Sequence, residues 1–180
     1  MRRGAGLLLV ATVALAGCVA SFGNGPAITD RTTDRSEDRA AIHALLVAYG
    51  ETLDARDFEG FAALFAREGT YGGGAGGAGA SPAEAAEAMR RIFADNPSGL
   101  GEPNYHVFFN EVVRFDGPDA ATATSKSFWV VPGEGGRPLP ALMAEYTDRI
   151  VREDGQWKFA RRQVRGLLPA PAAASSPPSD

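Results

Sequence analysis

The chain has 180 residues, of which 44% are hydrophobic and 22% charged, and its formal net charge is −4. This length and composition predict one ordinary globular domain with a single core, and nothing in them indicates a second domain. They argue against a nucleic-acid partner, because such a partner normally requires a basic face, and here the arginines are interspersed with acids.

The first 17 residues have the pattern of a signal peptide. Arg2 and Arg3 precede an apolar run from Leu7 to Leu15, which is shorter than the roughly 20 residues that cross a bilayer. The run closes with Leu-Ala-Gly-Cys and so resembles a bacterial lipobox, which predicts cleavage before Cys18 and lipidation of its thiol. The alternative is a secretory peptide cleaved nearby that leaves a free thiol.

A lipid on Cys18 would hold the protein at the cell envelope, facing the periplasm or the exterior. Val19 follows the cysteine, where an aspartate is associated with retention in the inner membrane, so the outer membrane is expected if the source is Gram-negative. Cys18 is the only cysteine, which excludes a disulfide within the chain. Residues 18–35 are then a flexible lipidated tether, residues 36–168 the folded domain, and residues 169–180 a disordered tail rich in Pro, Ala and Ser.

An amphipathic helix is predicted at the start of the domain, because one apolar stripe recurs at helical spacing. The stripe consists of Ile42, Leu45, Leu46, Tyr49 and Leu53. Asp54 follows the stripe directly, beside the buried face and near the helix C-terminus, where the helix dipole disfavours a negative charge. That position calls for a specific partner. Asp57 is the expected N-cap of a second short helix that ends near Phe65.

The glycine-rich residues 72–80 contain the spacing G-x-G-x-x-G. They do not predict a dinucleotide site, since no second parallel strand with an acid at its end follows. We expect a mobile loop instead, and no cofactor. Ser81, Pro82 and Glu84 form a capping box with proline at the first helical position, which predicts a third helix that runs to about Ala94.

From Asn104 onward the periodicity becomes that of strands, and the turns between them predict an antiparallel meander of four long strands. In the first, residues 105–115, one face is expected to carry His106, Phe108, Asn110 and Val112, and the other Val107, Phe109, Val113 and Phe115. Because both faces are apolar, one is expected to pack on the helices in a two-layer α+β domain. A second protomer is expected to cover the other, which predicts a homodimer through the sheet.

His106 and Asp54 are the residues best suited to proton transfer. A histidine titrates near neutral pH, and a nearby carboxylate fixes its tautomer. The alternatives are a structural histidine and an aspartate that binds backbone amides. Asp148 is expected to form an ion pair across the ladder with Arg161 or Arg162. Two separated histidines without clustered acids predict no metal site.

Many of these residues together resemble the nuclear transport factor 2-like superfamily, and within it the SnoaL-like branch. The matching positions lie within residues 36–166 and are Tyr49, Leu53, Asp54, Asp57, Phe58, Leu64, Phe65, Tyr105, His106, Asn110, Tyr146, Asp148 and residues 154–159. The resemblance implies a cone-shaped α+β fold, in which three N-terminal helices pack on a curved, mainly antiparallel sheet and leave a cavity.

The resemblance also bears on the chemistry. Asp54 and His106 correspond to the acting aspartate and histidine of the similar scytalone dehydratases. Tyr49 aligns with the oxyanion-binding tyrosine of ketosteroid isomerases, but the position of their general base is Gly73 here, which argues against steroid isomerisation.

We therefore predict a cofactor-independent dehydratase, isomerase or cyclase in which His106 and Asp54 act on a small apolar or aromatic organic molecule. The residues expected to contact that molecule are Tyr49, Tyr71, Phe108, Asn110 and Tyr146. Because this fold also hosts proteins without chemistry, the alternative is a non-catalytic ligand- or protein-binding module at the cell envelope.

Overall fold

The computed structural model describes residues 35–72, 79–97 and 99–167, all of which lie in one compact unit. The expected signal peptide, Cys18, nearly all of the tether, residues 73–78 of the glycine-rich segment and the C-terminal tail lie outside the described residues. Within the described part of the chain, no helix is both long and apolar enough to cross a membrane.

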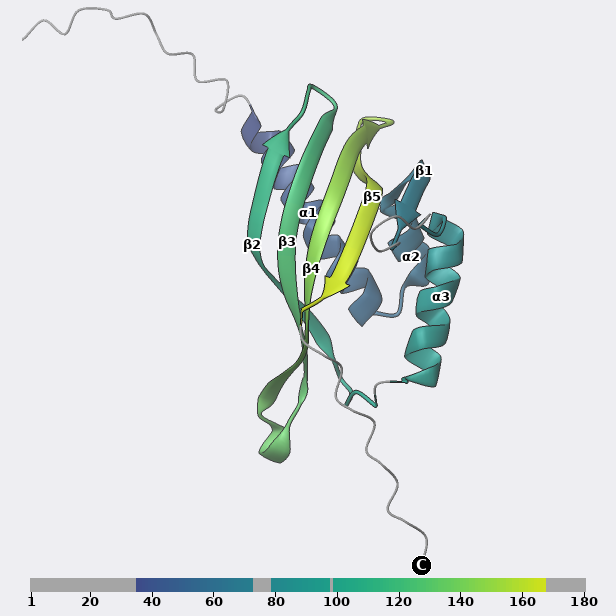
Figure 1. The fold of residues 1–180 in the computed structure, drawn as a ribbon, viewed down its shortest axis with the longest axis vertical. Coiled ribbons are helices and arrows are strands. Elements are labelled where there is room, and N and C mark those ends of the chain that lie inside the picture. The colour runs from purple at the N-terminus through teal and green to yellow at the C-terminus, as the bar shows by residue number, and fades with distance from the viewer. Residues whose placement is uncertain (1–34, 73–78, 98, 168–180) are drawn as a thin grey trace, which may run out of the picture. The chain divides into compact units, whose positions relative to one another are not determined.

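In the described residues, three α-helices and one five-stranded sheet make up the fold (Figure 1). In chain order the elements are α1 (Ser36–Asp54), α2 (Phe58–Ala63), β1 (Phe65–Tyr71), α3 (Pro82–Asp95), β2 (Tyr105–Phe115), β3 (Ala120–Pro132), the 3₁₀ turn η2 (Glu134–Gly136), β4 (Pro138–Glu153) and β5 (Gln156–Gly166). The strand order is β1-β5-β4-β3-β2, with β1 parallel to β5 and the other pairs antiparallel. The α+β class and the mainly antiparallel sheet are confirmed, but β1 separates α2 from α3 in the chain.

The predicted apolar stripe fixes α1 against the sheet. All five of its residues are buried, and α1 packs on β2 and β5 along one side of the sheet (Figure 1). Burying each large apolar side chain contributes about 1.5–3 kcal/mol, so this stripe anchors the helix that ends at Asp54.

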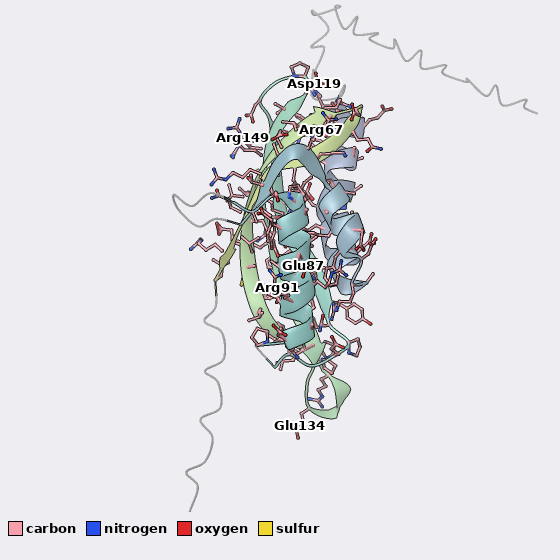
Figure 2. The ribbon with its side chains drawn as sticks, turned by 90° about the vertical axis from the view of Figure 1, so that its right-hand side faces the viewer. Arg67, Glu87, Arg91, Asp119, Glu134 and Arg149 are labelled. Atoms are coloured by element: carbon pink, nitrogen blue, oxygen red, sulfur yellow. The ribbon has the colours of Figure 1, made fainter. Side chains whose placement is uncertain are left out.

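Helix capping follows the sequence closely. The Asp57 side chain accepts a hydrogen bond from the Gly60 backbone N–H at 2.8 Å, although α2 ends at Ala63 rather than near Phe65. The predicted capping box between Ser81 and Glu84 starts α3, and Asn96 ends it in a left-handed conformation. The exposed surface of α3 carries an ion pair between Glu87 and Arg91 (Figure 2).

A β-bulge in β2 overturns the predicted alternation of its second half. Phe109 pairs with Lys126 but Val112 pairs with Thr124, so two residues oppose one, and Asn110 has φ 53°. The extra residue exchanges the two faces beyond that point. Val113 and Phe115 therefore pack against the core on the His106 side, and Val112, expected there, is 45% exposed.

The side of the sheet away from the helices, called the outer face below, is partly apolar. Tyr105, Val107 and Val112 are exposed on it, and the rings of Phe109 and Phe128 stack with their centroids 4.9 Å apart. Toward β5 this face becomes polar, and Arg149 projects from it (Figure 2).

Candidate active site

The carboxylate of Asp54 holds both the side chain and the backbone of His106. Asp54 Oδ1 lies 2.6 Å from His106 Nδ1, and Asp54 Oδ2 accepts a hydrogen bond from the His106 backbone N–H at 2.9 Å. Arg56 fixes the turn after α1, because its guanidinium donates to the Leu53 carbonyl at 2.8 Å and to Asn104 Oδ1 at 3.2 Å. The helix end that carries Asp54 is thereby tied to the segment that enters β2.

This contact determines which ring nitrogen is available for chemistry. With a carboxylate at Nδ1, the neutral imidazole carries its proton there, so Nε2 is left as a proton acceptor. No residue that the structure describes makes a hydrogen bond to Nε2. The His106 side chain is only 7% exposed, and its ring stacks on Trp129 with centroids 5.2 Å apart. The ring is therefore held in one orientation.

His106 lines a mostly apolar cavity of about 430 Å³ between the helices and the inner side of the sheet. Such a volume lies within the range of pockets that take a small organic molecule. The residues lining it are Tyr49, Leu53, Tyr71, Met89, Ile92, Phe93, His106, Ser127, Trp129, Leu142, Met143, Ala144, Tyr146, Val164 and Gly166.

Four hydroxyl groups meet in this cavity and are called the hydroxyl chain below. The Tyr49 and Tyr71 oxygens lie 2.8 Å apart, those of Tyr146 and Ser127 lie 3.0 Å apart, and the rings of Tyr49 and Tyr146 are in contact, with their centroids 5.6 Å apart. Each of these two hydroxyl pairs uses one of its two protons for the hydrogen bond within the pair, so at least one O–H remains to donate to a ligand. Burial raises the pKa of Tyr49 and Tyr146 and raises that of Tyr71 to about 12, which keeps these phenols protonated.

Trp129 and Ser127 are two hydrogen-bonding residues of the cavity that the sequence did not indicate. The buried indole Nε1–H of Trp129 has no hydrogen-bond partner among the described residues, although the side chain lines the cavity. Both residues lie on the inner face of β3, alternating with outward side chains. Period-two alternation along this strand is the signal that would have indicated them.

Two predicted contact residues do not reach this cavity. Phe108 packs its ring against Tyr49 and Tyr146 and lines, together with Asn110 and Asp54, a separate groove of about 360 Å³ near α1. Asn110 is exposed at the bulge. The structure thus brings Tyr49, Tyr71, Tyr146 and His106 together around one cavity, with Asp54 behind the histidine.

The expected ion pair of Asp148 forms with Arg162, at 3.1 Å between Oδ2 and Nη1, and both side chains are 0% exposed. Burial raises the pKa of Asp148 to about 6, although the neighbouring Arg162 opposes the rise. Among the described residues, no three or more His, Cys, Asp or Glu side chains are grouped so that they could hold a metal ion.

Residues 34–163 match the family model of the SnoaL-like domain. No protein with a curated description matches the chain in sequence. Among solved structures, the chain is similar to a protein of unknown function from Mycobacterium tuberculosis, with 26% identity and a TM-score of 0.58, over 83% of this chain and 82% of that one.

Two further structures share the fold. One, provisionally described as a scytalone dehydratase from Novosphingobium aromaticivorans, is 21% identical with a TM-score of 0.62, over 82% of this chain and 96% of that one. The other is the hexachlorocyclohexane dehydrochlorinase LinA-type3 from Novosphingobium barchaimii, 21% identical with a TM-score of 0.61, over 82% of this chain and 99% of that one.

Proposed function

The chain belongs to the family of SnoaL-like domains, and we propose that it is a cofactor-independent lyase or isomerase for a small apolar organic molecule. One observation carries the proposal: His106, fixed by Asp54 at 2.6 Å, borders an apolar cavity that also holds unused hydrogen-bond donors. Solved relatives described as a dehydratase and a dehydrochlorinase make an elimination or isomerisation reasonable for this fold.

In the proposed reaction, His106 Nε2 takes a proton from a carbon next to a carbonyl group. The carbonyl oxygen gains negative charge and is held by the hydroxyl chain. Asp54 stabilises the imidazolium that results. His106 then returns the proton, either to a departing hydroxyl, which leaves as water while a C=C bond forms, or to another carbon, which gives an isomer.

Hydrogen exchange tests the proposal even though the natural substrate is unidentified. The protein is incubated in D₂O with a panel of cyclic ketones and β-hydroxy ketones, with NMR to detect deuterium beside the carbonyl and mass spectrometry to detect loss of water. Enzyme-dependent exchange or loss of water that disappears in His106→Gln supports the proposal. Compounds that bind in the cavity without either change contradict it.

The second candidate is a non-catalytic binding module at the cell envelope. It is favoured by the second contact of Asp54, which accepts the His106 backbone N–H and so has a structural role of its own. In this case ligands bind in the cavity, no compound is converted, and ligand affinity is unchanged in Asp54→Asn and His106→Gln.

We also propose that the mature chain begins at a lipidated Cys18, which anchors it in the cell envelope. The support is the signal peptide pattern that closes with Leu-Ala-Gly-Cys. Mass spectrometry of the mature N-terminal peptide from the membrane fraction should show a diacylglycerol-modified cysteine. An unmodified peptide that begins elsewhere would contradict this.

We further propose that two chains associate through the outer face. The exposed Tyr105, Val107 and Val112 support this, since apolar side chains gathered on one sheet face favour an interface. Light scattering of residues 36–168 should give twice the monomer mass, and Val107→Lys should give the monomer, whereas Glu87→Lys on exposed α3 should not. A monomer at micromolar concentration would refute the dimer.

A further inference from the structure

Three arginines lie in one row across the sheet. Arg114 of β2 is paired with Thr122 of β3, Thr122 with Arg149 of β4, and Arg149 with Arg161 of β5. Because neighbouring strands lie about 4.8 Å apart, the row spans roughly 14 Å from β2 to β5. Arg114, Arg149 and Arg161 are called the arginine row below.

The arginine row lies on the outer face, away from the helices. Side chains that follow one another along a strand point to opposite faces of the sheet, and the neighbours of the row along its three strands, Val113, Asp148 and Arg162, are turned toward the core. Figure 2 shows Arg149 projecting from the outer face. The main cavity and the groove near α1 are lined by none of the three arginines, so the row is separate from both.

No carboxylate neutralises the arginine row. Among the residues that the structure describes, none of its three members forms a salt bridge, and Arg161 Nε is buried without a hydrogen-bond partner. Glu145, an acid of β4 on the same face, pairs instead with Arg165 at 3.2 Å. Arg149 and Arg161 stand directly opposite each other, and like charges in that position destabilise a sheet. The stability of the free protein therefore does not explain the row, whereas an anionic partner would.

The row is a basic surface on an acidic protein. The formal net charge of the full chain is −4, and Arg2 and Arg3 of the expected signal peptide supply two of its positive charges, so the mature chain is more acidic still. A guanidinium fits a phosphate group particularly well, because it can donate two parallel hydrogen bonds to it. A row of guanidinium groups on an open sheet face suits a flat layer of phosphates, and the proposed lipid on Cys18 would hold the domain beside such a layer.

We propose that the arginine row docks the domain on a bilayer that contains anionic phospholipids. Each arginine near such a surface adds to the electrostatic attraction, which falls off within a Debye length. The helices and the cavity lie on the inner side of the sheet, so docking through the outer face leaves them on the side away from the lipid. The inference concerns a surface and does not depend on any reaction at His106.

Sedimentation with vesicles tests the proposal. Residues 18–180 are used with Cys18→Ser, so that no lipid is attached, and the vesicles contain phosphatidylcholine alone or mixed with phosphatidylglycerol. At low ionic strength the protein should sediment with the mixed vesicles only, and about 1 M salt, which shortens the Debye length to about 3 Å, should release it. Arg149→Gln combined with Arg161→Gln should weaken binding by at least about tenfold, whereas Arg149→Lys combined with Arg161→Lys should keep most of it.

Arg91→Gln is the matched control, because Arg91 is an exposed arginine on α3, on the helix side of the sheet (Figure 2). It should bind the mixed vesicles as the wild type does. The proposal is overturned if the wild type does not bind them, if it binds neutral vesicles equally well, or if the double glutamine variant binds like the wild type. Should that variant fail to fold, Arg114→Gln combined with Arg149→Gln gives the same test.

Two other occupants of this surface are distinguished by the same variants. A second copy of the chain placed on the row would set arginines against arginines, and the apolar residues that support the proposed dimer lie on β2. The double glutamine variant should therefore have the same mass as the wild type by light scattering, and a changed mass would assign the row to a contact between two copies. Binding to inorganic polyphosphate that is tighter than binding to the mixed vesicles would assign it to a soluble polyanion. Either result overturns the proposal.

Discussion

Replacing His106 with glutamine should abolish proton transfer and leave the fold intact. A general base contributes about 10²–10⁴-fold to the rate of such a reaction, and glutamine cannot accept and return the proton at neutral pH. The backbone N–H at this position still donates to Asp54 Oδ2, 2.9 Å away, so the contact between α1 and β2 persists. Deuterium exchange into the substrate should therefore fall by at least two orders of magnitude, while the circular dichroism spectrum is unchanged.

The chain contains its own control for this substitution. His43 is the only other histidine, and its side chain is 65% exposed. Its Nδ1 lies 2.7 Å from Glu111 Oε2, and His43 does not line the cavity. His43→Gln should exchange deuterium at the wild-type rate. Turnover retained in His106→Gln would remove His106 from the mechanism.

The Asp54→Asn variant tests whether Asp54 acts through its negative charge or only by holding the backbone of His106 in place. The asparagine oxygen can still accept the His106 backbone N–H, but an amide offers no negative charge to the imidazolium and can hold the ring in the wrong tautomer. We expect a rate loss that approaches that of His106→Gln, with little change in stability. A rate equal to the wild type would mean that Asp54 serves only as a structural ligand of the β2 backbone.

The helices and the strands could be predicted from the sequence because local interactions determine them. The apolar stripe of α1 and the capping box at Ser81 each depend on residues within a few positions of one another, so the spacing in the sequence was sufficient. The position of Asp54 just beyond that stripe was informative for the same reason, since a charge at that place needs a partner.

The bulge at Asn110 could not be predicted from the sequence, since the residue with positive φ is neither glycine nor proline. Asn110 takes a left-handed conformation where the register between β2 and β3 shifts by one residue, and the Glu111 that follows pairs with His43 of α1. The orientation of the arginines could not be predicted for the same reason. A shift in the β4–β5 register next to Ile150 turns Arg162 inward and leaves Arg161 on the other face. Such one-residue shifts depend on tertiary packing, and each moves side chains to the other face.

Truncating Arg162 to methionine should produce the largest loss of stability among the site variants. Asp148 would remain 0% exposed with no cation beside it, and breaking a buried pair on one side typically costs about 3–5 kcal/mol. Urea denaturation near neutral pH should show this loss in the free energy of unfolding. Arg162→Met combined with Asp148→Leu should recover much of it, because both charges are then replaced by apolar groups.

The pH dependence distinguishes this explanation from a simple packing defect. Burial raises the pKa of Asp148 from 3.8 to about 6 in the folded protein, so the folded state binds that proton more tightly than the unfolded state. The resulting contribution to stability is complete below pH 3.8 and is lost as the pH rises through about 6. The wild type should therefore lose stability across this window, and Asp148→Asn should lack that dependence.

Removing Arg162 raises the pKa of Asp148 further, since the only opposing influence disappears. The carboxyl of the variant then takes up a proton readily in mild acid, so Arg162→Met should be much less destabilised at about pH 5 than at about pH 8. Asp38 does not affect this comparison. A hydrogen bond from the Trp157 indole lowers the pKa of Asp38 to about 2, so the contribution of Asp38 to stability changes only in stronger acid. An equal destabilisation at both pH values would mean that Arg162 stabilises the folded protein through the volume it fills, and that it does not do so by neutralising the charge of Asp148.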